Sequence, residues 1–192
     1  MTADRGHRER QQEAVRLEAD AYRRLLEGDR AGAEPVLIEA AERYRESWEL
    51  APPGGYGRLV GMLKAAILAG GGGDEARYVG DALGRHGGSP TAWYALGLAA
   101  LLEDDDGLAR AAAEGMASGG EPFARAAAAM LALAGRQAAS YSEALGAIVA
   151  DFEGREAHLT GVAFADTALM FERLAERRGM AAGARSPMLP PA

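Results

Sequence analysis

The sequence predicts an all-α protein of about nine helices arranged as an array of antiparallel hairpins. Apolar residues recur at three- and four-residue spacings along almost the whole chain, which is the period of helices that bury one face. Alternating runs of β-branched residues, which are typical of strands, are absent. Short connections rich in glycine, proline or aspartate separate the periodic segments. The helices are expected at about residues 9–28, 30–50, 56–69, 74–86, 90–103, 106–118, 121–134, 139–153 and 163–179.

Residues that favour turns bound each predicted helix in the first half of the chain. Gly28 and Asp29 separate the first two helices, and the Pro-Pro-Gly-Gly segment at 52–55 ends the second. Proline removes a backbone donor and glycine adopts conformations closed to other residues, so both interrupt helices. Four glycines at 70–73 separate the third helix from the fourth, which Asp74 is expected to cap.

The second half of the chain has similar boundary residues. Gly87 and Gly88 end one helix, Ser89 is the expected N-cap of the next, and Pro90 suits its first position. The Gly-Gly-Glu-Pro segment at 119–122 repeats this arrangement. Short connections of this kind predict that neighbouring helices are antiparallel.

Length and composition indicate one domain. The chain has 192 residues, of which 48% are hydrophobic and 26% are charged. This size allows a core large enough for the chain to fold unaided. We expect a flexible N-terminus at 1–8, a single helical-repeat domain at 9–180 and a proline-containing tail at 181–192. The tail carries few charges, so it is expected to pack on the last hairpin with Leu189 as its anchor. A disordered tail that folds only on a partner is the alternative, which its prolines also permit.

Charge and residue usage exclude several functional classes. The formal net charge of −7 argues against a general affinity for nucleic acid or anionic membranes. Without cysteine there is no disulfide framework, thiol nucleophile or thiolate metal site. The first residues lack the apolar segment of a secretory signal, and no apolar run reaches the roughly 20 residues of a membrane span. We therefore expect a cytoplasmic protein.

Lysine is almost absent from the sequence. Lys64 is the only lysine among 21 basic residues. Arginine in place of lysine, together with scarce isoleucine and phenylalanine, indicates GC-rich codon usage. The arginines as a group therefore carry no functional weight.

Helix pairs recur along the chain with small residues in similar places. The clearest pair has Trp93, Leu96 and Gly97 in its first helix and Ala109 early in its second. This pattern resembles a tetratricopeptide repeat, whose W-x2-L-G opening and later alanine it matches. The resemblance covers about residues 10–120 and implies a TPR-like α–α superhelix. The residues expected to pack the repeats are Ala21, Ala33, Ala76, Trp93, Leu96, Gly97 and Ala109.

The match is specific in one repeat, and the rest of the pattern is looser. Ala100 replaces the usual tyrosine, and Pro122 falls about one position late. In the second hairpin, Lys64 stands where a small residue should pack. An irregular helical bundle rich in alanine therefore remains an open alternative.

The end of the chain carries a different pattern. Leu174, Arg178 and Gly179 belong to an L-A-x-x-R-G segment, and an S-x-x-L-P segment begins at Ser186. Together they resemble the closing motif of a helical family of bacterial immunity proteins, which neutralise polymorphic toxins. The resemblance implies one dedicated toxin partner. From the residues alone, Gly179 is expected to end the last helix and Ser186 to begin a turn.

Two segments concentrate carboxylates without the spacing of a metal site. The Glu-Asp-Asp-Asp run at 103–106 lacks the alternating ligands of a calcium loop, and helix capping explains it better. The segment from Asp151 to His158 has neither the H-E-x-x-H nor the Glu-x-x-His spacing of metal-binding helices. His158 is expected to be a surface or capping residue, and no metal site is predicted.

Motifs of catalysis and cofactor binding are also missing from the sequence. The glycines at 70–73 are not followed by Lys-Ser or Lys-Thr, so they do not form a phosphate loop. No G-x-S-x-G nucleophile segment occurs. We predict no catalytic residues and no cofactor, although an all-α enzyme with a site assembled in space remains an alternative.

Aromatic and arginine side chains anchor many protein interfaces. Trp93 and Phe123 are expected in the core, whereas other such residues fall on the inner helices of a curved array. The residues expected to line one partner-binding groove are Tyr56, Arg58, Tyr94, Arg125 and Arg136. We therefore expect a non-catalytic protein-binding module that presents a groove of helical hairpins to another protein or peptide. An immunity protein that neutralises a cognate toxin is the alternative.

Overall fold

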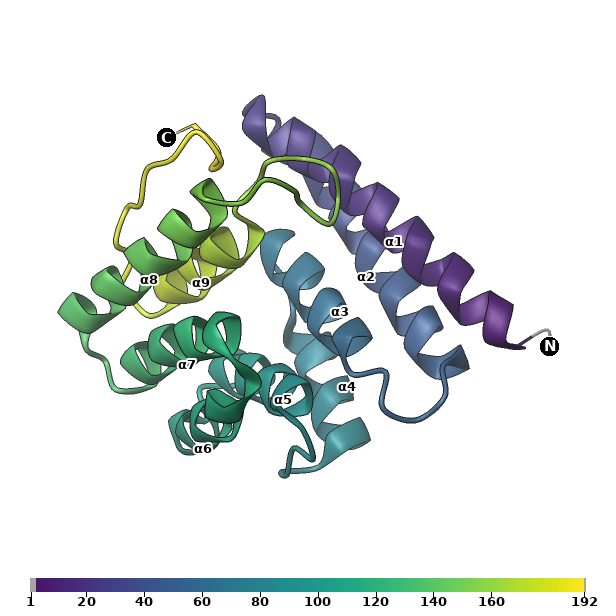
Figure 1. The fold of residues 1–192 in the computed structure, drawn as a ribbon, viewed down its shortest axis with the longest axis horizontal. Coiled ribbons are helices and arrows are strands. Elements are labelled where there is room, and N and C mark those ends of the chain that lie inside the picture. The colour runs from purple at the N-terminus through teal and green to yellow at the C-terminus, as the bar shows by residue number, and fades with distance from the viewer. Residues whose placement is uncertain (1–2, 192) are drawn as a thin grey trace.

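The computed structural model describes residues 3–191, and this part of the chain is all-helical, as the sequence predicted (Figure 1). Every predicted helix has its counterpart, and no strand occurs within 3–191. A 3-10 turn, Ala117–Gly119, follows the sixth helix. The helices are α1 (Ala3–Leu26), α2 (Arg30–Leu50), α3 (Gly57–Leu68), α4 (Gly73–Leu83), α5 (Pro90–Leu102), α6 (Asp106–Met116), α7 (Glu121–Ala134), α8 (Ala138–Glu153) and α9 (Asp166–Arg177).

Successive helices pack against each other along the whole array. In addition, α3 contacts α5, and α5 contacts α7, so that alternate helices form an inner layer. In Figure 1 the α1–α2 hairpin lies on one side of the molecule, and α5 to α8 lie on the other. The prediction of an all-α array of helical hairpins is thus confirmed.

The last helix departs from this regular succession. After α8, the chain crosses toward α1 in the loop at 154–165, where the Phe164 ring stacks on the Tyr22 ring with 4.4 Å between centroids (Figure 1). Helix α9 then packs against α3 as well as against α7 and α8. The C-terminal segment therefore connects the end of the array to its beginning.

Side-chain caps fix three of the helix starts near the positions that the sequence indicated. Asp29 accepts a hydrogen bond from the Gly32 amide, Ser89 from the Ala92 amide and Asp105 from the Leu108 amide. These bonds satisfy backbone donors that have no partner inside the helix. Asp74 does not cap α4. The helix starts one residue earlier, behind Gly72 at φ +113°, and Asp74 lies in its first turn.

The start of α1 also differs from the sequence expectation. The helix begins at Ala3, not near residue 9, and His7 is buried on it. Ser47 donates to the His7 carbonyl oxygen at 2.5 Å, and an Arg58 nitrogen lies 2.8 Å from His7 Nδ1. Of the segment 1–8 that was expected to be flexible, residues 3–8 are helical, and residues 1 and 2 lie outside the described part.

The tail after α9 runs back over the molecule. The Glu172 carboxylate accepts hydrogen bonds from the amides of Ala182 and Gly183, and the Ala165 amide donates to the Met188 carbonyl oxygen at 2.8 Å. Leu189 is half-buried and packs against the core. The tail is therefore attached at several points between α9 and its end.

The residues expected to pack the repeats are buried, except that Trp93 is half-buried. Gly97 of α5 lies where three helices meet. A Cβ atom at this position would lie 3.1 Å from the Ala112 Cβ and would overlap the Met130 side chain. Glycine at this position thus allows α6 and α7 to approach α5 closely, and a larger residue would require the end of the Met130 side chain to move.

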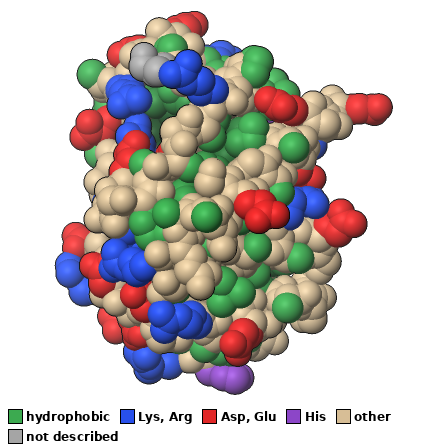
Figure 2. All heavy atoms as spheres, turned by 90° about the vertical axis from the view of Figure 1, so that its left-hand side faces the viewer, with side chains coloured by type: hydrophobic (Ala, Val, Ile, Leu, Met, Phe, Trp, Pro, Cys, Tyr) green, Lys and Arg blue, Asp and Glu red, His purple; other side chains and the backbone are tan. Residues whose placement is uncertain are grey.

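Within residues 3–191, none of the helices combines the length and the apolar character that a membrane-spanning segment requires. Figure 2 shows one face of the molecule, on which acidic and basic side chains are interspersed with apolar ones.

Candidate functional site

A buried cluster of charged and phenolic side chains surrounds the only lysine. Lys64 Nζ on α3 lies 2.5 Å from Asp166 Oδ2 at the start of α9 and 3.6 Å from Glu18 Oε1 on α1. Glu18 is fully buried, and the other two side chains are 15% exposed. This cluster therefore joins three helices that lie far apart in the sequence.

Two tyrosines complete the cluster. The Tyr22 hydroxyl lies within hydrogen-bond distance of Glu18, at 3.1 Å, and of Asp166, at 3.3 Å. The Tyr44 hydroxyl on α2 donates to the second Glu18 oxygen at 2.8 Å. Both Glu18 oxygens are thus hydrogen-bonded, as a buried carboxylate requires.

The electrostatics of the cluster favour the charged forms of Lys64 and Asp166. Burial by itself lowers the pKa of Lys64, but Asp166 and Glu18 oppose this so strongly that the pKa lies well above its ordinary value. Burial raises the pKa of Asp166, and the Lys64 ammonium reverses this, so the net pKa is below the ordinary value. Lys64 is therefore protonated at neutral pH and lacks the lone pair that a nucleophile or general base needs.

Sequence reasoning missed this cluster, although one signal was present. Lys64 is the one lysine in a chain that otherwise uses arginine, and it occupies a position where the repeat pattern expects a small residue. A compact ammonium and a planar guanidinium are not interchangeable. The lysine at position 64 was therefore the signal in the sequence that an ammonium group has a specific place in the structure.

A second feature is a cavity of about 120 Å³, which we call the aromatic–arginine pocket. Helices α5, α7, α8 and α9 supply its lining, together with Arg155 just after α8. The lining residues are Tyr94, Pro122, Phe123, Arg125, Ala126, Ile148, Asp151, Phe152, Arg155 and Thr167.

Ring contacts and ion pairs fix the walls of this pocket. The Tyr94 and Phe123 rings meet edge to face with 6.1 Å between centroids, and the Arg155 guanidinium lies 3.7 Å from the Phe152 ring centroid. Arg125 and Arg155 each approach a different oxygen of Asp151, both at 2.5 Å. The pocket therefore offers an apolar floor beside two positioned guanidinium groups.

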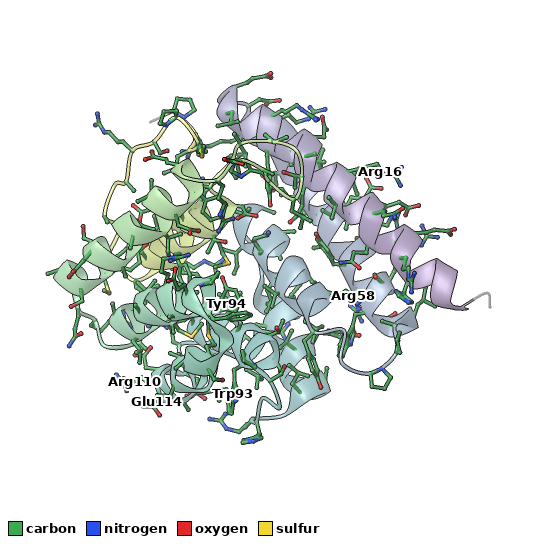
Figure 3. All side chains as sticks on the ribbon, viewed as in Figure 1. Arg16, Arg58, Trp93, Tyr94, Arg110 and Glu114 are labelled. Carbon is green, nitrogen blue, oxygen red and sulfur yellow. The ribbon has the colours of Figure 1, made fainter. Side chains whose placement is uncertain are left out.

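The structure brings together only two of the five residues that were expected to line one groove. Tyr94 and Arg125 both line the aromatic–arginine pocket. Tyr56 packs on the Trp48 ring at 5.7 Å, and Arg58 donates to Ser47 at 2.7 Å, so both face the α1–α2 hairpin. Tyr94 and Arg58 lie well apart in Figure 3.

Arg136 lies at another end of the array. It follows α7 in a left-handed conformation, with φ +55°, and one guanidinium nitrogen lies 3.5 Å from the Arg178 carbonyl oxygen. Its nearest carboxylates are Asp104 and Asp106, both at 3.9 Å. Arg136 is thus separated from Tyr94 and Arg125 because it lies in the turn between α7 and α8 and not on an inner helix.

The C-terminal motif contributes arginines to helix ends. Arg178 is almost completely buried and donates to the Leu101 carbonyl oxygen at the end of α5, while its guanidinium contacts Asp106 at 2.5 Å. Arg177 donates to the carbonyl oxygens of Gly70 and Gly71, just after α3. Cations at these positions satisfy unpaired carbonyl groups and complement the helix dipole. Gly179 follows at φ +66°.

Residues of the two acidic segments contact other parts of the protein. In the run at 103–106, Asp105 caps α6. The His158 ring stacks on Phe152 at 6.2 Å, near the aromatic–arginine pocket. Across the described residues, no group of three or more histidine, aspartate or glutamate side chains is placed to hold a metal ion.

Comparison of the chain with known proteins identifies no relative. No family model, no curated protein and no solved structure matches the chain. The arrangement of the residues themselves is therefore the basis for a functional conclusion.

Proposed function

We propose that this protein is a non-catalytic binding module whose aromatic–arginine pocket receives an apolar side chain of a partner protein or peptide. The observation that carries the proposal is the combination of Tyr94, Phe123 and Phe152 with two ion-paired arginines around one small cavity. Aromatic and arginine residues in a desolvated pocket are the usual anchors of protein interfaces.

The dimensions and rigidity of the pocket support this function. A volume of about 120 Å³ suits one aliphatic or aromatic side chain rather than a large cofactor. Asp151 holds both guanidinium groups in place, so little side-chain entropy is lost when a partner binds.

The chemistry of the buried cluster supports a binding function over catalysis. The Lys64 amine is held protonated beside Asp166 and Glu18. Lys64 lies close to both carboxylates, and these three groups connect α1, α3 and α9. Tyr22 and Tyr44 supply the hydrogen bonds to the Glu18 oxygens. A structural role, in which the cluster holds α1, α3 and α9 together, accounts for this arrangement and requires no substrate.

The test is selection of a random peptide library on the purified protein, followed by fluorescence anisotropy with an enriched peptide. Enriched sequences are expected to share an aliphatic or aromatic residue. Arg155→Ala and Phe123→Ala should each weaken binding about tenfold, as expected for anchor residues. Circular dichroism and urea unfolding of each variant verify that it is folded.

Arg45→Ala is the matched control. Arg45 lies over the Tyr78 ring at 4.3 Å and pairs with Glu49 four residues away, just as Arg155 lies over Phe152 and pairs with Asp151. It does not line the pocket. Peptides that bind both pocket variants as tightly as the unaltered protein would contradict the proposal.

Toxin neutralisation is a special case of this proposal, with one dedicated partner. The support for it is the resemblance of the C-terminal segment, with Leu174, Arg178 and Gly179, to the closing motif of immunity proteins. The expected result is that co-expression protects cells from a toxin encoded beside this chain, and that Phe123→Ala reduces the protection. Protection that is insensitive to pocket variants would place the toxin interface elsewhere.

A further inference from the structure

A groove separate from the aromatic–arginine pocket runs between α2 and α4, and we call it the α2–α4 groove. Its volume is about 280 Å³. Ala66 and Ala69 of the α3 end and the glycine turn at 70–72 supply small residues to its lining, and Ile38 of α2 supplies an apolar wall. Ile38 is 48% exposed, although most large apolar side chains of the protein are buried.

The two charged side chains that line this groove are both acidic. Glu34 on α2 and Glu75 on α4 both line it, and no lysine, arginine or histidine does. Neither carboxylate forms a hydrogen bond or ion pair with any other residue in 3–191. Elsewhere on α2, Glu39 and Glu46 both pair with Arg43.

The glycine turn gives the groove a fixed wall. The Gly71 amide donates to the Ala66 carbonyl oxygen at 2.9 Å, and Arg177, which does not line the groove, binds the carbonyl oxygens of Gly70 and Gly71. Gly72 has φ +113°, and a Cβ there would lie 3.0 Å from Leu102. The run of four glycines thus allows a close, ordered turn, which leaves the groove open before any partner arrives.

We propose that the α2–α4 groove binds a basic side chain, arginine or lysine, from a segment of a partner protein. The aliphatic stem of such a side chain would lie along Ile38, Ala66 and Ala69, and its cationic head would lie between Glu34 and Glu75. Long basic side chains combine an apolar stem with a charged end in this way. Two unpaired carboxylates beside an apolar surface complement this chemistry and oppose an acidic partner.

This binding is independent of the aromatic–arginine pocket, and the three isoleucines of the sequence separate the two sites in one experiment. Ile38 lines the α2–α4 groove and Ile148 lines the aromatic–arginine pocket. Ile67 is 1% exposed and reports on the core. With ¹³C-labelled isoleucine δ1 methyl groups, each site has its own NMR signal.

The probe is the peptide acetyl-Gly-Ala-Arg-Ala-Gly-amide, titrated into the full chain. The Ile38 signal should shift saturably, while the Ile148 and Ile67 signals stay in place. The same peptide with glutamine in place of arginine should bind at least several-fold more weakly, because it lacks the charge. Added salt should weaken binding of the arginine peptide, since Glu34 is exposed and Glu75 is only half-buried, so that salt screens both charges.

Glu34→Gln and Glu75→Gln should each weaken binding about threefold, as expected for partly exposed charge pairs, and the double variant should weaken it further. The matched control is Glu114→Gln, because Glu114 is also exposed and unpaired within 3–191 but lies on α6, far from α2 in Figure 3. This control should bind like the unaltered protein.

The inference would be overturned by an Ile38 signal that does not respond to the arginine peptide, or by an Ile38 response of equal strength to the glutamine peptide. An Ile38 response that survives the double variant would overturn it as well. A shift of Ile148 alone would also overturn it, because the peptide would then occupy the other site, and the proposed function of the pocket would stand.

Discussion

The Lys64 side chain joins segments that are far apart in the sequence. Its ammonium contacts Asp166 and lies 3.6 Å from Glu18, and both carboxylates have phenolic hydroxyl groups nearby. Buried charges are tolerated only when they are paired and hydrogen-bonded, and removal of one partner leaves the others without compensation.

Lys64→Met should therefore lower the free energy of unfolding by about 3 kcal/mol, because Asp166 and Glu18 would keep their burial and lose the opposing charge. Urea unfolding followed by circular dichroism measures this change. Asp166→Asn should be less damaging in the Lys64→Met background than alone, since the two residues are coupled. Additive effects in this double-mutant cycle would show that the ion pair is not a stabilising contact.

The close contact of helices at Gly97 can be tested by substitution. Gly97→Leu should destabilise the protein by about 1–3 kcal/mol, because a side chain at this point overlaps Met130 and Ala112. The measurement is the urea midpoint. Gly146→Leu is the control, since Gly146 is helical with open space around it, and this change should be neutral or stabilising. An unchanged midpoint for Gly97→Leu would reject the close helix contact.

Contacts at both of its ends hold helix α9 in place. It packs against α3, which is far from it in the sequence, as well as against α7 and α8. Asp166 binds Lys64 at its start. At its other end, Arg177 binds the carbonyl oxygens of Gly70 and Gly71 just after α3, and Arg178 binds that of Leu101 in the last turn of α5. The tail then contacts Glu172 of α9 and the loop residue Ala165.

Truncation before Ser186 should lower the free energy of unfolding by about 1–3 kcal/mol, because it exposes the surface that Leu189 covers and removes the bond from Ala165 to Met188. Thermal and urea unfolding measure the loss, and Leu189→Ala should reproduce a part of it. Binding at the aromatic–arginine pocket should persist in the truncated protein. Unchanged stability with lost partner binding would instead assign the tail to the interface.

The pH dependence of stability arises from titrating groups on several helices. Burial raises the pKa of Tyr22 and of Tyr44, and the neighbouring carboxylates raise the pKa of Lys64 against the effect of burial. The ordinary values are 10.0 for tyrosine and 10.5 for lysine. Above these values the unfolded chain loses protons that the folded protein keeps.

The free energy of unfolding should therefore fall as the pH rises above about 10, since the unfolded state then binds fewer protons. Urea unfolding at about pH 8 and about pH 11 measures the slope. Tyr44→Phe should make the slope shallower by removing one titrating group, while Tyr56→Phe, at a half-buried position outside the cluster, is the control. A slope that Tyr44→Phe leaves unchanged would contradict this account.

Local sequence determined the helices themselves. The apolar period, the caps at Asp29 and Ser89, and the glycine and proline breaks act over a few residues, so the number and most boundaries of the helices could be predicted. The start of α1 was missed because His7 is held by Ser47 and Arg58, and no local signal reports such a contact.

The positions of these helices, and the side chains that meet between them, depend on tertiary packing. The return of α9 to α3, the cluster around Lys64 and the separation of Tyr56 and Arg136 from Tyr94 all depend on residues far apart in sequence. Helical period fixes the face of a residue on its own helix, but the angles between helices follow from packing of many side chains at once. For that reason the sequence alone determined an all-α array, and the structure placed the sites on it.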